Sequence, residues 1–271
     1  MYLQGLAEPE RTPLRYHGGK WRIAPWIVEH FPSHDNYVEV FGGAAGVLLR
    51  KQRSRIEVYN DADRQVFGFF CVLRDPDQRS RLIESVALTP FSRDEFDLSY
   101  EPSLCPVESA RRFVLRCYFG HGTCSIDTKD SNGFRSCDIR ARKSYAREWV
   151  GIPDAIAAAG ARMQGVTLEN LDFRKLIPKF DDAGTLFYVD PPYPFETRSM
   201  GGKGYVHELS NQDHRQLAWM LKSIRGQVVI SGYDCRLYDE LYRDWNRDQK
   251  RTMASGQFGA VPRTEVIWMN F

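Results

Sequence analysis

The most informative segment of this sequence is Thr185-Leu186-Phe187-Tyr188-Val189-Asp190-Pro191-Pro192-Tyr193. Its first five residues are mostly apolar, β-branched or aromatic, which is typical of a buried strand. Neither proline can donate a hydrogen bond to a sheet, so the strand ends at Asp190 and the loop after it is stiff. Ligands of open α/β sheets bind at the carboxyl ends of the strands. The segment therefore predicts an α/β fold with a site at Asp190, although a proline-rich turn that only caps a core strand has a similar composition.

These residue types suit methyl transfer to an amino group that is conjugated with a ring. Such an amine is a poor nucleophile, and it needs acceptors for its two N–H bonds rather than a strong base. The carboxylate of Asp190 and the carbonyl of Pro191 supply two acceptors on a rigid loop. Tyr193 offers a flat face on which a base taken out of the double helix can stack.

Two strands with glycine-rich or acidic ends are predicted upstream. Residues 36–41 form the first, and the turn Gly42-Gly43-Ala44-Ala45-Gly46 and an apolar helix through Val47, Leu48 and Leu49 follow it. Residues 55–61 form the second, which ends at Asp61, about 20 residues after the turn, where a ribose-binding carboxylate belongs. The pattern indicates a nucleotide-type cofactor site. A turn without a ligand, and helix capping by Asp61 and Asp63, are the alternatives, and a nicotinamide dehydrogenase would need a true Gly-x-Gly-x-x-Gly here.

A third glycine motif, Tyr16-His17-Gly18-Gly19-Lys20, precedes an amphipathic helix predicted from Trp21 to about His30. It reads either as a turn before a helix or as a cofactor clamp, in which glycines allow close backbone approach, Lys20 supplies charge and the aromatic ring packs on a ligand. The remaining elements are predicted as helices over 64–73, 110–119, 153–163, 174–180 and 235–244, a helix capped by Ser210 or Asn211, and strands over 166–169, 227–231 and 264–271.

Together these motifs resemble the Dam-like family of N6-adenine DNA methyltransferases. That family carries Asp-Pro-Pro-Tyr at the step occupied by residues 190–193, and a Phe-x-Gly-x-Gly turn from which residues 41–46 depart by an alanine. It also carries an aromatic-x-Gly-Gly-Lys that Tyr16 and Lys20 match, and an Asp-Phe at the third strand end that Asp172 and Phe173 match. The resemblance covers residues 14–271 and is weakest over 75–150.

The resemblance implies a doubly wound, Rossmann-like methyltransferase sheet built from residues 1–74 and 151–271. Residues 75–150 would form an inserted, largely helical or irregular target-recognition domain. S-adenosylmethionine would be the cofactor, no metal would be needed, and the substrate would be an adenine flipped out of duplex DNA. The implied catalytic residues are Asp190, Pro191, Pro192 and Tyr193. The implied cofactor-binding residues are Tyr16, Lys20, Phe41, Gly42, Gly43, Gly46, Asp61, Asp172, Phe173 and Asp190.

The distribution of charge also favours a nucleic-acid partner. Lys and Arg number 37 and Asp and Glu 35, so the net charge is only +2. Residues 105–148 nevertheless hold nine basic and five acidic side chains, a local excess of +4. Phosphate neutralisation dominates DNA affinity, so this segment is the predicted DNA contact, although a solvated surface would look similar. The candidate DNA-binding residues are Arg116, Lys129, Arg135, Arg140, Arg142, Lys143, Arg198 and Lys203.

Two other functions are compatible with these motifs. An amine methyltransferase that acts on RNA or a protein side chain would share the cofactor half, and a catalytically silent DNA-binding relative would share the whole fold. The six cysteines form no Cys-x-x-Cys pair, which leaves only Cys117, Cys124 and Cys137 with His121 as a minor metal candidate. We expect a cytoplasmic protein with no membrane segment, a monomer or weak dimer, whose restriction endonuclease partner, if there is one, is a separate chain.

Overall fold

The computed structural model describes residues 9–121, 133–139, 142–198, 205–256 and 259–271. The chain divides into two compact units. The first, here called the helical unit, comprises Met1–Trp21, Gly43–Arg50 and Asp63–Leu168. The second, the sheet unit, comprises Arg22–Gly42, Lys51–Ala62 and Glu169–Phe271. The helical unit takes in more than residues 75–150, and the predicted bounds of an inserted recognition domain stay a prediction.

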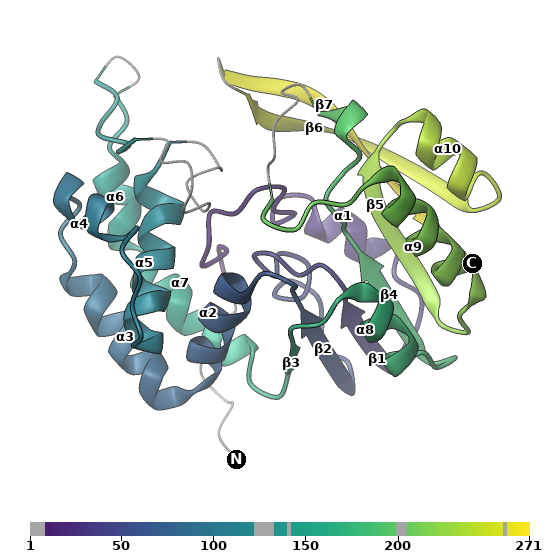
Figure 1. Ribbon diagram of the computed structural model, residues 1–271, viewed down its shortest axis with the longest axis horizontal. Coiled ribbons are helices and arrows are strands. Elements are labelled where there is room, and N and C mark those ends of the chain that lie inside the picture. The colour runs from purple at the N-terminus through teal and green to yellow at the C-terminus, as the bar shows by residue number, and fades with distance from the viewer. Residues whose placement is uncertain (1–8, 122–132, 140–141, 199–204, 257–258) are drawn as a thin grey trace. The chain divides into compact units, whose positions relative to one another are not determined.

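One mixed sheet organises the sheet unit, and Figure 1 labels its strands. The seven strands run in the order β3-β2-β1-β4-β5-β7-β6. Parallel pairs join β1 to β2 and β4, and β4 to β5, whereas β7 is antiparallel to both β5 and β6. This arrangement confirms the predicted α/β class. The strands are β1 (Asn36–Glu39), β2 (Ile56–Asn60), β3 (Thr167–Glu169), β4 (Thr185–Val189), β5 (Gln227–Tyr233), β6 (Asn246–Gly256) and β7 (Gly259–Met269).

Both faces of the central strands are buried, as parallel strands require. Every residue of β4 is buried. Alternate residues such as Val38 and Phe187 pack in one hydrophobic core with α8 (Phe173–Phe180), α9 (Asn211–Ser223) and α10 (Arg236–Tyr242). On the other face Phe31, which follows α1 (Ala24–Glu29), packs its ring against the rings of Tyr37 and Tyr188. Side chains therefore cover the central strands on both faces, and the strand pairing fixes their register.

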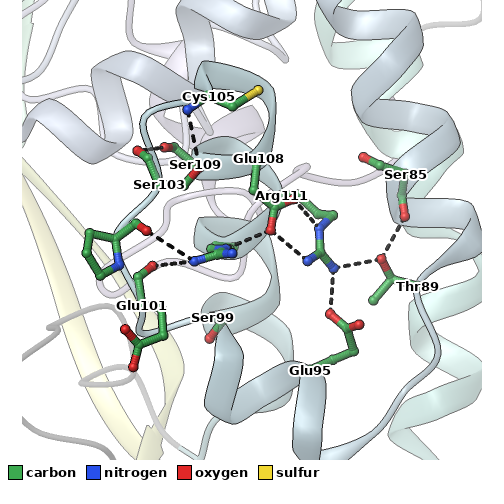
Figure 2. A network of polar contacts seen from close by, with 12 residues as sticks. Ser85, Thr89, Glu95, Ser99, Glu101, Ser103, Cys105, Glu108, Ser109 and Arg111 are labelled. Carbon is green, nitrogen blue, oxygen red and sulfur yellow. Dashed lines mark hydrogen bonds and ion pairs between the residues drawn. The ribbon is translucent and has the colours of Figure 1, made fainter.

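The helical unit is held together partly by a buried guanidinium, drawn in Figure 2. Arg111 donates to both carboxylate oxygens of Glu108 at 2.7 and 2.8 Å, to Glu95 at 2.7 Å and to Thr89 at 3.0 Å. These contacts tie together α3, α4 and α5, and the Glu108 and Glu95 carboxylates raise the pKa of Arg111 above its usual value. The helices of this unit are α2 (Arg64–Arg74), α3 (Pro76–Leu88), α4 (Arg93–Leu98), α5 (Pro106–Phe119), α6 (Tyr145–Val150) and α7 (Ile152–Arg162).

Two expectations about local structure are wrong. The predicted helix through Val47, Leu48 and Leu49 is a series of turns. Its start is interrupted because Gly43 and Ala45 adopt left-handed backbone conformations, with φ of 48° and 55°, and such residues do not extend a right-handed helix. The final strand begins at Gly259 rather than 264, and it pairs along its whole length with β6, a strand that the sequence analysis did not predict.

Candidate active site

The carboxyl ends of the parallel strands bring several of the predicted residues to one edge of the sheet. Strands β2, β1, β4 and β5 are neighbours in that order and run in the same direction. Asp61 therefore follows β2, Phe41 follows β1 and Asp190 follows β4 at the same edge. This is the position at which open α/β sheets bind ligands.

Asp190 is held by a hydrogen-bond chain that the sequence analysis missed. Ser231, on the neighbouring strand β5, donates from its hydroxyl to Oδ1 of Asp190 at 3.1 Å. The hydroxyls of Ser231 and Tyr188 are themselves 2.9 Å apart, and both residues are buried. The chain fixes the direction of one carboxylate oxygen of Asp190 at the end of β4. Ser231 appeared in the sequence only as the last residue of a predicted strand.

Tyr193 is held at its hydroxyl and at its ring. The hydroxyl donates to Oε1 of Glu265, a buried residue of β7, and the ring lies edge-on to that of Tyr233, with 4.8 Å between centroids. Only 9% of Tyr193 is exposed. Burial and the nearby carboxylates of Asp190 and Glu265 raise the pKa of Tyr193 well above its usual value, so the hydroxyl stays protonated and remains a donor. The orientation of the ring is therefore set by β5 and β7.

Arg198, predicted to bind DNA, braces the same loop. Its guanidinium forms two 2.8 Å hydrogen bonds with the carboxylate of Glu208 and donates to the carbonyl of Tyr193 at 2.5 Å. A paired carboxylate neutralises much of this charge. Its predicted contact with DNA stays a prediction.

A buried histidine lies close to the backbone of Pro192. His214 of α9 is fully buried, and its Nδ1 is 3.2 Å from the hydroxyl of Tyr238. Among the described residues, its Nε2 has no hydrogen-bond partner. Burial lowers the pKa of His214 from 6.5 to about 4, and the Asp213 carboxylate and the Pro192 carbonyl oppose this shift only in part. His214 is therefore neutral at physiological pH.

This depressed pKa predicts a pH-dependent loss of stability. The unfolded chain takes up a proton at His214 near pH 6.5, whereas the folded protein resists it until about pH 4. The free energy of unfolding should therefore fall as the pH drops through this interval, by up to ~3 kcal/mol at pH 4 and below. The measurement is urea unfolding between pH 4 and pH 7.5 for the wild type and His214→Gln. The glutamine variant should show the shallower pH dependence, and equal slopes would contradict the prediction.

Buried Asn60 and half-buried Asn170 hold the segment around Asp61, and the sequence analysis missed both. Asn60 donates from Nδ2 to the carbonyls of Val40 at 2.8 Å and Leu171 at 3.1 Å, and its Oδ1 accepts from the Leu171 amide at 2.8 Å. Asn170 donates to the carbonyl of Asp61 at 2.7 Å. One amide side chain thus joins the ends of β1 and β2 to the segment after β3. Asp61 itself is half-buried, at the end of β2.

Asp172 and Phe173 begin α8 at this edge. Asp172 is the N-cap of α8 and accepts from the amide of Arg174 at 2.8 Å, with a second 2.8 Å contact to the Arg174 guanidinium. Capping, the alternative left open for this residue, is therefore observed. The ring of Phe173 is buried in the core, 5.9 Å from the ring of Phe41. Asp63 likewise caps α2, because its side chain accepts from the amide of Gln65.

The glycines after β1 are enclosed by protein atoms. A Cβ placed on Gly42 would lie 2.1 Å from Cε2 of Tyr59 in the sheet unit. In the helical unit, a Cβ on Gly43 would lie 3.1 Å from the Tyr16 ring, and one on Gly46 would lie 3.0 Å from the Trp21 amide nitrogen. Lys20 is buried and donates to the carbonyl of Gly18 at 2.8 Å. The glycine motifs thus have a packing role within each unit.

Besides Arg198, the predicted DNA-binding residues fall into three groups. Arg116 and Arg135 are buried: Arg116 donates to Ser99 and Gln65, and the Arg135 guanidinium lies 3.3 Å from the centre of the Tyr145 ring. Their charges are engaged inside the helical unit, and we leave both out of the proposed contacts. Arg142 and Lys143 are exposed. Lys129, Arg140 and Lys203 lie outside the described residues.

The described part of the chain holds neither a metal-binding cluster nor a membrane-spanning helix. No group of three or more His, Cys, Asp or Glu side chains there could hold a metal ion. Of the minor metal candidate, Cys117 is buried and Cys137 is exposed, while Cys124 lies outside the described residues. No described helix is long and apolar enough to cross a membrane.

The chain is similar to a known protein family, to a characterised relative and to a solved structure. Residues 16–255 match the model of a family described as D12 class N6 adenine-specific DNA methyltransferase. A DNA adenine methylase from Serratia marcescens is 24% identical over 246 residues, which cover 87% of this chain and 86% of the relative. A crystal structure of a precorrin 8w decarboxylase from Methanobacterium thermoautotrophicum covers 92% of this chain and 89% of its own, at 12% identity and a TM-score of 0.36. A likeness that low carries no argument.

Proposed function

Because this chain belongs to the D12 class of N6 adenine-specific DNA methyltransferases, we propose that it transfers a methyl group from S-adenosylmethionine to N6 of an adenine within a short duplex sequence. The observation that carries the proposal is Asp190, which follows β4 and is oriented by the hydroxyl of Ser231. Phe41 and Asp61 follow the neighbouring strands at the same edge. An oriented acceptor beside a nucleotide-type site is what amine methylation requires.

The residues of the sheet unit fit S-adenosylmethionine. Asp61 places a carboxylate at the end of β2, where it can accept from ribose hydroxyls. Phe41, packed on Phe173, offers an apolar aromatic surface beside it for the adenine ring. In the helical unit, Tyr16 and Lys20 stay predicted cofactor-binding residues. Gly42, Gly43 and Gly46 also stay predicted cofactor-binding residues.

In the proposed reaction, the Asp190 carboxylate and the Pro191 carbonyl each accept one N6–H bond. Two fixed acceptors hold the amine so that its lone pair points away from both, toward the incoming carbon. When bound, S-adenosylmethionine supplies that carbon on a positively charged sulfur, which leaves as a neutral thioether while the N–C bond forms. One N6 proton must then depart, and the Asp190 carboxylate is the group placed to take it on to water. Positioning and polarisation of the amine supply the rate enhancement.

An adenine inside a duplex cannot reach Asp190, so the proposal includes base flipping. Stacking of the flipped base on Tyr193 remains part of it. Glu265 and Tyr233 support this role because they fix the hydroxyl and the ring plane of Tyr193 from the side. A pre-oriented ring would lose little conformational freedom when a base stacks on it.

The test is incubation with labelled S-adenosylmethionine and unmethylated plasmid DNA, followed by nucleoside analysis and site mapping. Total RNA and a protein mixture are incubated in parallel, and the Asp190→Ala variant serves as the blank. We expect label in N6-methyladenine at one short sequence. Label in RNA or protein but not in DNA would replace the substrate in this proposal. DNA binding without any transfer would identify a catalytically silent relative.

A further inference from the structure

The last two strands form a ribbon that extends past the rest of the sheet. The pairing of β7 with β5 ends at Tyr233 and Glu265, whereas its pairing with β6 continues to Gly256 and Gly259. Residues 251–256 and 259–264 are therefore a two-stranded ribbon, which we call the distal ribbon. Six residues per strand span about 20 Å. Figure 1 shows β6 and β7 reaching beyond the end of β5.

The register also fixes which edge the distal ribbon leaves from. Strand β5 runs parallel to β4, so Tyr233 lies at the same edge as Asp190. Strand β7 is antiparallel to β5, and its residues before Glu265 must lie beyond Tyr233. The ribbon thus projects from the reactive edge of the sheet. At its base, Glu265 accepts the hydroxyl of Tyr193.

Basic side chains outnumber acidic ones on the distal ribbon and at its base, where the register places Lys250 opposite Glu265. Residues 249–264 contain Lys250, Arg251 and Arg263 and no acidic residue. Lys250 and Arg251 are exposed and Arg263 is half-buried. Within the described residues, no ion pair engages any of the three. Nearer the core, by contrast, Arg247 pairs with Asp234 at 2.9 Å.

The distal ribbon exposes apolar side chains to solvent. Met253, which pairs opposite Pro262, is 56% exposed, and Val261 is 38% exposed. A two-stranded ribbon without a covering layer is marginally stable in water. Cationic side chains beside exposed apolar ones instead suit an anionic, grooved partner. Duplex DNA is such a partner, because its major groove admits a two-stranded ribbon and its phosphates line the groove.

We propose that the distal ribbon is a second DNA-binding element, in which Arg251 and Arg263, with Lys250 at the base, contact phosphates beside the target adenine. The proposal rests on the proposed function, because the partner is the DNA substrate. It assigns part of the duplex affinity to the sheet unit, on the same rigid strands that position Asp190 and Tyr193. Contacts on these strands would set the distance between the bound phosphates of the DNA backbone and the flipped base.

The experiment compares two double variants with equal charge loss. Arg251→Gln/Arg263→Gln alters the ribbon, whereas Arg55→Gln/Lys222→Gln removes exposed charges that precede β2 and β5, at the opposite edge of the sheet. Binding of a 24-base-pair, mixed-sequence unmethylated duplex is measured by fluorescence anisotropy over a series of salt concentrations. The slope of log Kd against log salt should fall by about 1.8 for the ribbon variant, at about 0.9 per lost phosphate contact. Affinity at 0.1 M salt should fall roughly 10- to 100-fold.

Two further measurements separate this proposal from misfolding and from failure of the proposed function. Arg251→Lys/Arg263→Lys keeps both charges and should restore the wild-type salt slope. With plasmid DNA, the glutamine variant should raise KM while kcat at saturating DNA stays within about twofold. A wild-type salt slope in the ribbon variant, or equal losses in both double variants, would overturn the proposal. Absence of DNA methylation by the wild type would instead overturn the proposed function.

Discussion

Asp190→Ala should reduce methyl transfer at least about 1,000-fold while duplex affinity stays within about threefold of the wild type. The variant removes the acceptor that orients the N6 amine, and it leaves the backbone carbonyl of Pro191 in place. Asp190 is half-buried and lies after the buried strand β4, not within it. The measurements are single-turnover transfer from labelled S-adenosylmethionine and anisotropy with the same duplex.

Asp190→Asn is the matched control for this result. An amide keeps one acceptor oxygen and nearly the same shape, and it can still receive the hydroxyl of Ser231, but it cannot take up the departing proton. We therefore expect a loss of transfer smaller than that of the alanine variant. Near-normal turnover in Asp190→Ala would remove Asp190 from the mechanism. Equal losses in both variants would show that charge matters more than acceptor geometry.

Gly42→Ala should lower the stability of the protein by roughly 3 kcal/mol or more. A methyl group at this position would lie 2.1 Å from Cε2, 2.5 Å from Cζ and 2.7 Å from Cδ2 of Tyr59. The Tyr59 ring is rigid and fully buried, and its strand is paired with β1. The ring cannot move aside without shifting β2, and the Asp61 carboxylate that follows β2 would move with it. Thermal unfolding should show a melting temperature lowered by roughly 6–12 °C.

Gly68→Ala provides the comparison for the same chemical change. Gly68 lies within α2, and a Cβ there meets nothing within 4 Å. Alanine in a helix interior is favoured over glycine, so this variant should gain roughly 0.5–1 kcal/mol. Opposite signs for the two variants are the expected result. If the Gly42→Ala protein is as stable as the wild type, the Tyr59 ring does not prevent a larger side chain at position 42.

Local sequence patterns were sufficient where one residue type decides the outcome. The run from Thr185 to Val189 is mostly apolar, β-branched or aromatic, and it forms β4 with the predicted bounds. The prolines after Asp190 end that strand, and Ser210 caps α9 with a capping box. In each case the deciding interaction lies within a few residues of the chain, so composition carries it.

The interactions that the sequence could not predict join residues that lie far apart in the chain. Ser231 and Asp190 are 41 residues apart, and Asn60 and Leu171 are 111 residues apart, so neither pairing leaves a local pattern. Strand β6 carries Arg247, Asp248, Lys250 and Arg251, which lack the apolar alternation of a half-buried strand. The charge count over residues 105–148 predicted a free basic surface. It could not show that Arg111 and Arg116 are used inside the helical unit.

The pairing of β1 with β4 has a consequence for synthesis of the chain. Asn36 of β1 lies beside Thr185 of β4, 149 residues later. A ribosome that adds about 5–20 residues per second needs roughly 7–30 s to make that interval. During this time β1 can pair with β2, but its other edge has no strand to meet. Until β4 is made, the nascent chain therefore exposes one unpaired edge of β1, and an unpaired strand edge is a template for pairing with other chains.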